Sequence, residues 1–188
     1  MDAMHTAAVY DRLSVANVID GPVTDPAAVA LRTGQATYTG LGTVTASDGT
    51  VATAFLGDAT FNVDFDSDSV SGNIAMYSAT GGMDPDTDPQ AFFDQVEADP
   101  ETFLLSMDSA AGTVNLSGGS IVGAGFTLDA SSAPLTTNGT TVVVTGGTVT
   151  GEFTGADANG VRSTGSTVTG TVDGAPATDM AVYFAGAE

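Results

Sequence analysis

The feature that most constrains the fold of this chain is a two-residue alternation of apolar and polar side chains, which recurs through most of the sequence after residue 34. In the clearest example, Phe61, Val63 and Phe65 alternate with polar side chains. Successive side chains of a β-strand point to opposite faces, so this pattern is typical of a strand with one buried face and one face in water. The sequence therefore predicts an all-β fold.

A second segment, residues 70–76, repeats the alternation. The polar run at residues 66–69 predicts a turn, which makes the two segments an antiparallel hairpin. Further strands are predicted at residues 35–45, 112–117, 120–128, 140–145, 147–155, 165–172 and 179–185. The side chains expected to be buried are those of Phe61, Val63, Phe65, Ile74, Phe126, Phe153 and Phe184.

A short repeat places a glycine two residues after a valine, on the same face of a strand. It occurs as Val70 with Gly72, Val149 with Gly151, and Val168 with Gly170. In a closed barrel, inward glycines relieve crowding and let a strand bend, and closure removes exposed strand edges. We therefore predict an eight-stranded antiparallel β-barrel. A two-sheet sandwich with bulge glycines is the alternative.

The region before the strands is expected to hold one short amphipathic helix. Residues 4–19 have apolar side chains at a roughly helical period, and Gly21 and Pro22 are expected to end the helix. We assign residues 1–33 to this helix and a linker, and residues 34–188 to a single barrel domain.

A helical insertion between strands is expected at residues 79–111. Asp88 followed by Pro89 is typical of a helix N-terminus, and Phe92, Phe93 and Val96 follow at helical spacing. This insertion is expected either to plug one mouth of the barrel or to gate a ligand.

Charge and composition exclude several classes of function. The formal net charge is −20, with 23 acidic residues, three arginines and neither lysine nor cysteine. Phosphate backbones would be repelled, so nucleic acid is not an expected partner. Without cysteine there is no disulfide, thiolate metal site or thiol nucleophile. No apolar run approaches the roughly 18 residues that span a bilayer, and no secretion signal is visible.

One acidic loop resembles a calcium site in part. Asp84, Asp86 and Asp88 stand at alternate positions, as hard oxygen ligands for calcium would. The EF-hand pattern fails, because its sixth position is Pro89 and its twelfth is Gln95. Calcium binding by these three aspartates stays an open question, and we assign no metal site and no cofactor.

Catalytic residue types are scarce. The single histidine, His5, lies near a terminus and is expected to be solvated rather than a ligand for a metal or haem. Glu152 and many aspartates are present, but no spacing singles out a carboxylate pair. We therefore expect no enzyme activity. A binding module, a structural or adhesive surface protein and an unrecognised hydrolase are the classes left open.

Several segments resemble the transferrin-binding-protein-like β-barrel family. Residues 34–40, together with 59–65 leading into 69–72, are similar to the first three strands of that family. Residues 117–120, followed by an alternating strand, and the closing residues 182–187 resemble later parts of its barrel. The resemblance covers most of the chain, and its strength lies in the order and spacing of the segments.

One segment departs from the family pattern. Residues 153–161 keep an aromatic, a glycine and an asparagine but lack the proline and glutamate, so the chain resembles a divergent member. The resemblance implies a surface-exposed or secreted, non-catalytic binding protein for haem, a small solute or a protein. No ligand-contacting motif matches residue by residue, so the ligand-binding residues are unknown. A structural or adhesive cell-surface protein without a small-molecule ligand is the alternative.

Overall fold

The computed structural model describes residues 3–83 and 107–188, and these residues form two helices and eleven strands. The helices are α1 (Ala3–Val15) and α2 (Pro26–Val29). The strands are β1 (Gln35–Ser47), β2 (Ala52–Asp64), β3 (Ser69–Met83), β4 (Asp108–Ser109), β5 (Thr113–Val122), β6 (Gly125–Ser132), β7 (Leu135–Thr137), β8 (Thr140–Thr154), β9 (Gly160–Val172), β10 (Ala175–Pro176) and β11 (Asp179–Ala187). No helix in the described part of the chain has the length and apolar character needed to cross a membrane.

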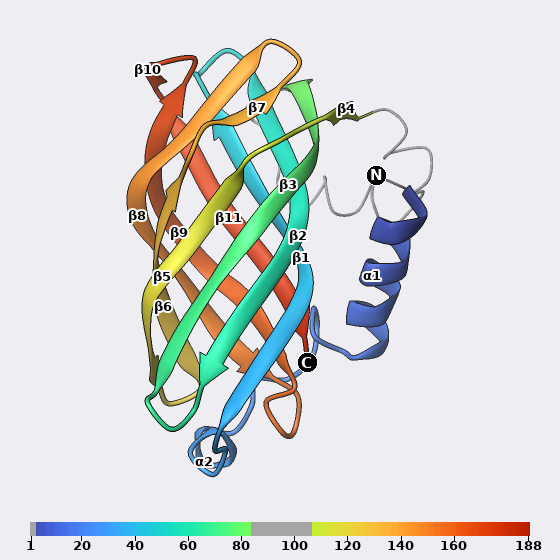
Figure 1. The fold of residues 1–188 in the computed structure, drawn as a ribbon, viewed down its shortest axis with the longest axis vertical. Coiled ribbons are helices and arrows are strands. Elements are labelled where there is room, and N and C mark those ends of the chain that lie inside the picture. Colours follow the sequence, from blue (N-terminus) through green and yellow to red (C-terminus); the bar gives the residue numbers. More distant parts are fainter. Residues whose placement is uncertain (1–2, 84–106) are drawn as a thin grey trace.

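Eight strands form a closed antiparallel ring in the order β1, β2, β3, β5, β6, β8, β9, β11 (Figure 1). The ring closes because β9 pairs with both β8 and β11, and β11 pairs in turn with β1. The short strands β4, β7 and β10 add to β3, β8 and β9 outside the ring. The predicted eight-stranded barrel is confirmed. The sandwich alternative is wrong, because a sandwich leaves free strand edges that this ring does not have.

The predicted hairpin forms β2 and β3. Its register pairs Val63 with Val70, so both valines face the interior. The carboxylate of Asp64 accepts hydrogen bonds from the backbone N–H groups of Asp66 and Ser67, at 3.0 and 3.1 Å, and so organises the turn. Both strands continue well beyond the predicted segments at the other end.

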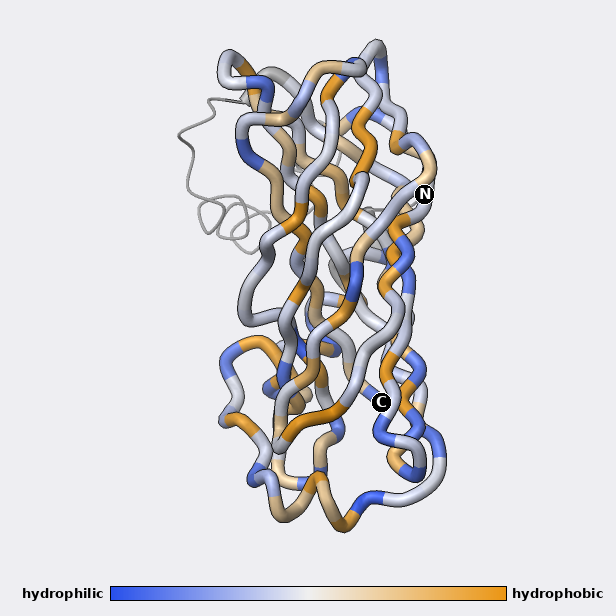
Figure 2. The backbone as a smooth tube through the Cα atoms, turned by 90° about the vertical axis from the view of Figure 1, so that its left-hand side faces the viewer, coloured by the Kyte–Doolittle hydropathy of each residue, from blue (hydrophilic) through white to orange (hydrophobic). Residues whose placement is uncertain are grey.

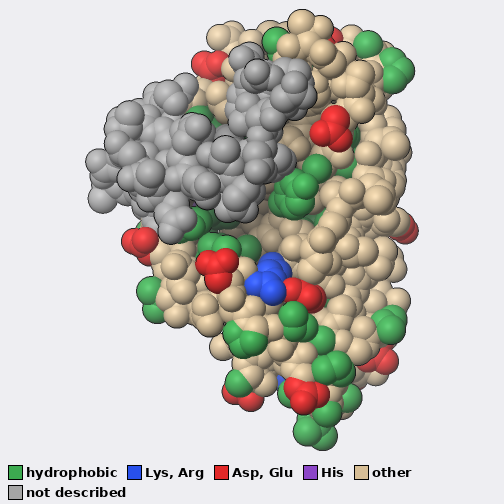
Figure 3. All heavy atoms as spheres, turned by 180° about the vertical axis from the view of Figure 1, so that it is seen from behind, with side chains coloured by type: hydrophobic (Ala, Val, Ile, Leu, Met, Phe, Trp, Pro, Cys, Tyr) green, Lys and Arg blue, Asp and Glu red, His purple; other side chains and the backbone are tan. Residues whose placement is uncertain are grey.

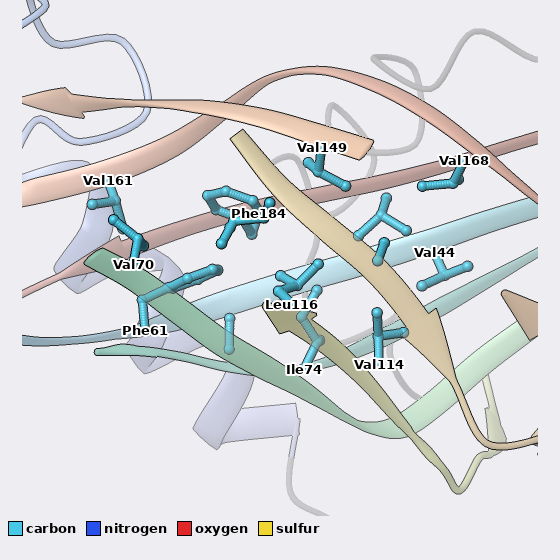
Figure 4. Close-up of a cluster of buried hydrophobic side chains, with 14 of the residues drawn as sticks. Val44, Phe61, Val70, Ile74, Val114, Leu116, Val149, Val161, Val168 and Phe184 are labelled. Carbon is cyan, nitrogen blue, oxygen red and sulfur yellow. The ribbon is translucent and has the colours of Figure 1, made fainter. Parts of the chain in front are cut away.

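The barrel interior contains all seven side chains that were predicted to be buried, with exposed fractions of 7% or less. Apolar positions recur along the strands (Figure 2). In Figure 4, Phe61 of β2 and Phe184 of β11, the two strands that flank β1, meet in the barrel interior, where their ring centroids are 4.3 Å apart.

The repeated glycines lie where large neighbours fill the space that a side chain would take. A Cβ built on Gly72 would lie 2.6 Å from Cδ1 of Phe61, and one on Gly151 would lie 2.6 Å from the Phe126 ring. On Gly170 it would lie 2.0 Å from the Val143 carbonyl oxygen and 2.7 Å from Cε of Met180. The glycines therefore make room for bulky core side chains, as predicted.

Two predicted strand breaks are wrong. The predicted gap at residues 118–119 lies inside β5, and the gap at residue 146 lies inside β8. At both places the pairing register shifts, and Gly118 and Gly147 have φ values of 67° and 108°. In β5 the diglycine forms a β-bulge, and in β8 it directly follows a bulge at Thr145, so both strands continue where a break was predicted. The true turn after β5 contains Gly123, which has a φ of 65°.

The N-terminal helix is confirmed but ends earlier than predicted, at Val15 rather than near Gly21. Asn17 has a φ of 54°, and its N–H donates to the Ser14 carbonyl at 2.9 Å. The N–H of Val18 donates to the carbonyl of Leu13 at 3.0 Å, and both side chains are buried. This is a Schellman C-terminus, in which asparagine takes the left-handed position that glycine usually occupies.

The predicted insertion at residues 79–111 is only partly within the described residues. Its first residues belong to β3, and residues 108–109 form β4, so both flanks are strand rather than helix. The predicted helix start at Asp88 and the acidic positions Asp84 and Asp86 lie outside the described residues.

Candidate functional site at the α2 end of the barrel

The barrel has two ends that differ in their connections (Figure 1). We call the end that carries α2 and the turns at residues 65–68, 123–124 and 155–159 the α2 end. The opposite end carries β7, β10 and the turn at residues 48–51, and we call it the β10 end. The candidate site lies at the α2 end, where the N-terminal segment crosses the barrel mouth.

Residues 22–25 extend the sheet at this end. The N–H of Thr24 donates to the Phe153 carbonyl at 2.9 Å, and the N–H of Phe153 donates to the Ala124 carbonyl at 2.8 Å. The N–H of Gly155 donates to the Pro22 carbonyl at 3.1 Å. The predicted linker is thus hydrogen-bonded to the end of β8 rather than free of the barrel.

Helix α2 covers the mouth of the barrel. The carboxylate of Asp25 caps the helix by accepting from the N–H of Ala27 at 2.8 Å, and Pro26 occupies the first turn. Val29 is buried and packs onto the barrel core. One short helical turn therefore holds an apolar side chain over the interior and presents its other residues to solvent.

Arg32 ties this cover to the rest of the α2 end. Its guanidinium donates to the Asp157 carbonyl at 2.5 Å and to the Glu188 carboxylate at 2.8 Å. It also lies 4.8 Å from the centroid of the Phe65 ring, in a cation–π contact. One side chain thus connects the N-terminal segment, the turn at residues 155–159, the end of β2 and the C-terminal residue.

Beneath the cover, Tyr38 is completely buried, and its hydroxyl donates to the Ala158 carbonyl at 2.6 Å. Burial raises the pKa of Tyr38 far above its ordinary value, so the hydroxyl stays protonated and remains a donor. Its role is to anchor the turn at residues 155–159 to β1.

Aromatic rings fill the interior of this half of the barrel. Phe153 is at the centre, with ring centroids of Phe126, Phe65 and Tyr38 at 5.3, 5.6 and 6.2 Å. Phe126 in turn stacks on Phe184 at 6.2 Å. The space behind the cover is therefore occupied by packed side chains.

The outer surface of the α2 end exposes large apolar side chains. Leu31 is 83% exposed, Val122 77% and Val23 48%. The turn that follows Val122 lies against α2, because a Cβ built on Gly123 would be 3.9 Å from Pro26. Figure 3 shows hydrophobic side chains gathered at this lower end of the molecule, with acidic ones beside them. We call the surface formed by Leu31, Val122, Val23 and Pro26 the α2-end face.

Exposed acidic side chains lie at the same end of the barrel as the α2-end face. They are Asp25, Asp66, Asp68, Asp157 and Glu188. Asp25 and Asp66 accept hydrogen bonds from backbone N–H groups, and Glu188 pairs with Arg32. This end therefore combines exposed apolar side chains with negative charges.

The residues singled out in the sequence lie elsewhere. His5 is on the outside of the barrel, 45% exposed, with Nε2 2.9 Å from the Asp58 carboxylate. Glu152 pairs with Arg162 at 2.7 Å rather than with a second carboxylate. Within residues 3–83 and 107–188, no three His, Asp or Glu side chains come together to hold a metal ion.

Sequence reasoning missed the α2-end face. A usable signal is present in the sequence, because Asp25 followed by Pro26 is the same helix-start pattern as Asp88 followed by Pro89. No sequence pattern around Val122 indicates that the turn after it lies against Pro26, because this contact depends on how β5 and the N-terminal segment meet in the folded barrel.

The fold defines the chain as an antiparallel β-barrel protein. No known protein family and no curated protein matches the sequence. The chain is similar to transferrin binding protein B from serogroup B Neisseria meningitidis, with a TM-score of 0.47 and 19% identity over 88% of this chain and 27% of that one. It is also similar to the transferrin binding protein B vaccine antigen of Haemophilus parasuis, with a TM-score of 0.48 and 17% identity over 89% and 28%. The predicted resemblance to this kind of barrel is confirmed as a distant one, and the chain spans little more than a quarter of either protein.

Proposed function

We propose that this protein is a non-catalytic binding protein that recognises another protein with the α2-end face. The observation that carries the proposal is the contrast between a barrel interior filled by side chains and the exposed Leu31 and Val122 outside it. Apolar side chains left exposed together and rimmed by polar residues are typical of protein interaction sites.

The packing of the interior argues against a small-molecule ligand inside the barrel. A Cβ built on Gly42 would lie 2.6 Å from Cδ1 of Ile74, and one on Gly119 would lie 2.6 Å from Cδ2 of Leu128. A haem or solute would have to displace such side chains, since protein interiors are close-packed. We therefore favour a protein partner on the outside over haem or a small solute within.

The arginines of the chain have structural partners, which argues against their use in catalysis. Arg12 donates to the hydroxyl and the carbonyl of Thr39 at 3.0 and 2.7 Å. Arg162 donates to Glu152 and to the carbonyl of Ile19. With Arg32, these residues join the N-terminal segment to the barrel, and none is left to polarise a substrate.

A surface-exposed or secreted location is part of the proposal and rests on the family resemblance. A structural or adhesive surface protein is the second candidate, because it needs no ligand pocket and the filled interior suits it equally well. The two differ in whether the α2-end face selects one partner.

The decisive experiment compares three baits of the same chain. The parent, the double variant Leu31→Ser with Val122→Ser, and the control Val51→Ser are immobilised and exposed to the protein mixture that the source organism encounters. Val51 is 41% exposed in a turn at the β10 end, so its replacement removes apolar surface elsewhere. We expect a partner held by the parent and the control and lost from the double variant. A partner held equally by all three would place the site elsewhere.

Titration with haem tests the interior. We expect no saturable change in the haem absorption spectrum, because the core leaves no site for it. A one-to-one change would overturn the proposal of an external protein site in favour of a ligand inside the barrel.

The predicted insertion is proposed as a second binding segment, separate from the α2-end face, because β3 runs to the β10 end, where Met83 pairs with Ala52. Ala79 pairs with Asp108 and Ser78 with Ser109, so the chain leaves and re-enters the barrel at neighbouring positions. Replacing residues 84–106 by a short Gly/Ser bridge is therefore expected to leave a folded barrel. Loss of partner binding with the fold intact would support a role for the insertion, and a variant that cannot fold would identify it as part of the core.

A further inference from the structure

We infer that the partner of the α2-end face is a protein or peptide surface that presents apolar side chains flanked by lysine or arginine. This inference rests on the proposed function, because it names the chemistry of the partner for the same site. It follows from three observations: the backbone that holds the apolar side chains, the charges that lie near them, and the charges that already have partners within the protein.

The apolar side chains of the face are held on ordered backbone. The N–H of Leu31 donates to the Ala28 carbonyl at 3.2 Å, directly after α2. Val122 is the last residue of β5 and pairs with Gly125 across the turn to β6. Contacts presented by ordered segments lose little conformational freedom on binding. Both side chains are therefore suited to act as fixed apolar anchors.

The charges around these anchors are predominantly negative. Arg32 is the cation among them, and its guanidinium is already bound to Asp157, Glu188 and the Phe65 ring. The carboxylate of Asp68 forms no hydrogen bond within the described residues, whereas that of Asp157 interacts electrostatically with the Arg32 guanidinium. Asp68 is therefore available to pair with a cationic group of a partner, and Asp157 adds to the negative potential, which gives such a partner both faster association and orientation.

The same charges disfavour other occupants. A second copy of this chain would bring its own net charge of −20 toward the face. An anionic membrane surface would be repelled for the same reason. A cationic protein surface is the occupant for which both the apolar anchors and the acidic surround are complementary.

The probe is a short amphipathic peptide of leucine and lysine, compared with the same pattern built from leucine and glutamate, and with phosphatidylcholine vesicles. Binding is measured at about 0.15 M NaCl, where exposed charges beyond about 8 Å are screened. Backbone and methyl NMR shifts map where each probe binds. We expect the leucine–lysine peptide to change the NMR shifts of Leu31 and Val122 and to leave those of Val51 unchanged.

Two pairs of variants separate the apolar and the charged contributions. The double variant Leu31→Ser with Val122→Ser is expected to bind the leucine–lysine peptide about tenfold more weakly than the parent, whereas Val51→Ser is expected to bind it with unchanged affinity. Asp68→Asn with Asp157→Asn is expected to weaken it several-fold and to reduce its salt dependence. The control pair for the charges, Asp108→Asn with Asp179→Asn, lies at the β10 end and is expected to have little effect.

The outcomes distinguish this inference from the proposed function. Equal binding of the leucine–glutamate peptide or of neutral vesicles at Leu31 and Val122 would overturn the cationic partner and keep the face as a binding site. Binding of the leucine–lysine peptide elsewhere on the barrel, unaffected by the serine variants, would overturn both.

Discussion

The two ends of this barrel are built from different side chains and closed in different ways. At the α2 end, the interior holds Tyr38, Phe61, Phe65, Phe126, Phe153 and Phe184 beneath an added cover of N-terminal residues. At the β10 end, the buried side chains are smaller or flexible ones, such as Ala46, Val142, Val144, Val172 and Met180, with Phe55 as a buried aromatic.

The β10 end is held together mainly by its own polar turns. The carboxylate of Asp48 accepts from the N–H groups of Thr50 and Val51 at 2.7 and 3.0 Å, and the N–H of Thr178 donates to the Ser47 carbonyl at 2.8 Å. The two ends therefore differ in their surfaces as well: within the described residues, Val23, Leu31 and Val122 are the large exposed apolar side chains of the α2 end, and Val51 is that of the β10 end.

The largest expected effect is the loss of the central ring at the α2 end. Phe153→Ala should lower the free energy of unfolding by about 3–5 kcal/mol, because it removes contacts with three other rings and leaves a cavity. Val144→Ala at the β10 end should lower it by only about 2 kcal/mol. Urea titration of both variants measures the difference, and equal losses would remove the energetic distinction between the two ends.

A smaller loss is expected from overfilling the aromatic half. Gly151→Ala should destabilise by about 1–3 kcal/mol, because its Cβ would meet the Phe126 ring at 2.6 Å. Gly146→Ala, in the same strand toward the β10 end, is the matched control, because nothing lies within 4 Å of its Cβ. It should be neutral or slightly stabilising. A tolerated Gly151→Ala would show that the rings have room to move.

The cover should contribute less than the core beneath it. Arg32→Ala is expected to lower the free energy of unfolding by about 1–2 kcal/mol, because it loses two charge-assisted hydrogen bonds and the contact with Phe65. Arg12→Ala, which loses only contacts with Thr39 on the outer wall, should cost less. Hydrogen exchange of residues 22–32 should rise in the Arg32 variant alone, and unchanged exchange would mean that the cover is held without Arg32.

The smallest effect is expected from acid, and it should affect both ends. Hydrogen bonds from Val51 and Thr50 lower the pKa of Asp48, and those from Gln35 and Ser67 lower the pKa of Asp64, both from an ordinary 3.8. A lowered folded pKa means that each carboxylate stabilises the fold above pH 3.8 and that this stabilisation is lost as the pH falls through the folded pKa. Asp48→Asn and Asp64→Asn should therefore lower the unfolding midpoint at neutral pH and match the parent in strong acid. A difference that persists in acid would assign the effect to the amide rather than to the lost charge.

Much of the barrel was predictable because its signals are local. The alternation at residues 59–65 and 70–76 predicted an antiparallel hairpin with Phe61, Val63, Phe65 and Ile74 on its buried face, and β2 and β3 confirm it. The strand breaks predicted at residues 118–119 and 146 were wrong, because glycine next to a β-bulge looks the same in the sequence as glycine in a turn. The neighbouring strand decides between them, since only a partner that keeps pairing on both sides turns a break into a bulge.

By itself, the sequence determined an all-β chain of alternating strands, inward glycines that make closure possible, and a strongly acidic surface without cysteine or lysine. The tertiary structure alone decided which end is aromatic and covered, and that the exposed Leu31 and Val122 both lie at that end. The physical reason is that alternation specifies which face of a strand is buried, whereas the joining of strands into a ring specifies which distant residues meet at each mouth.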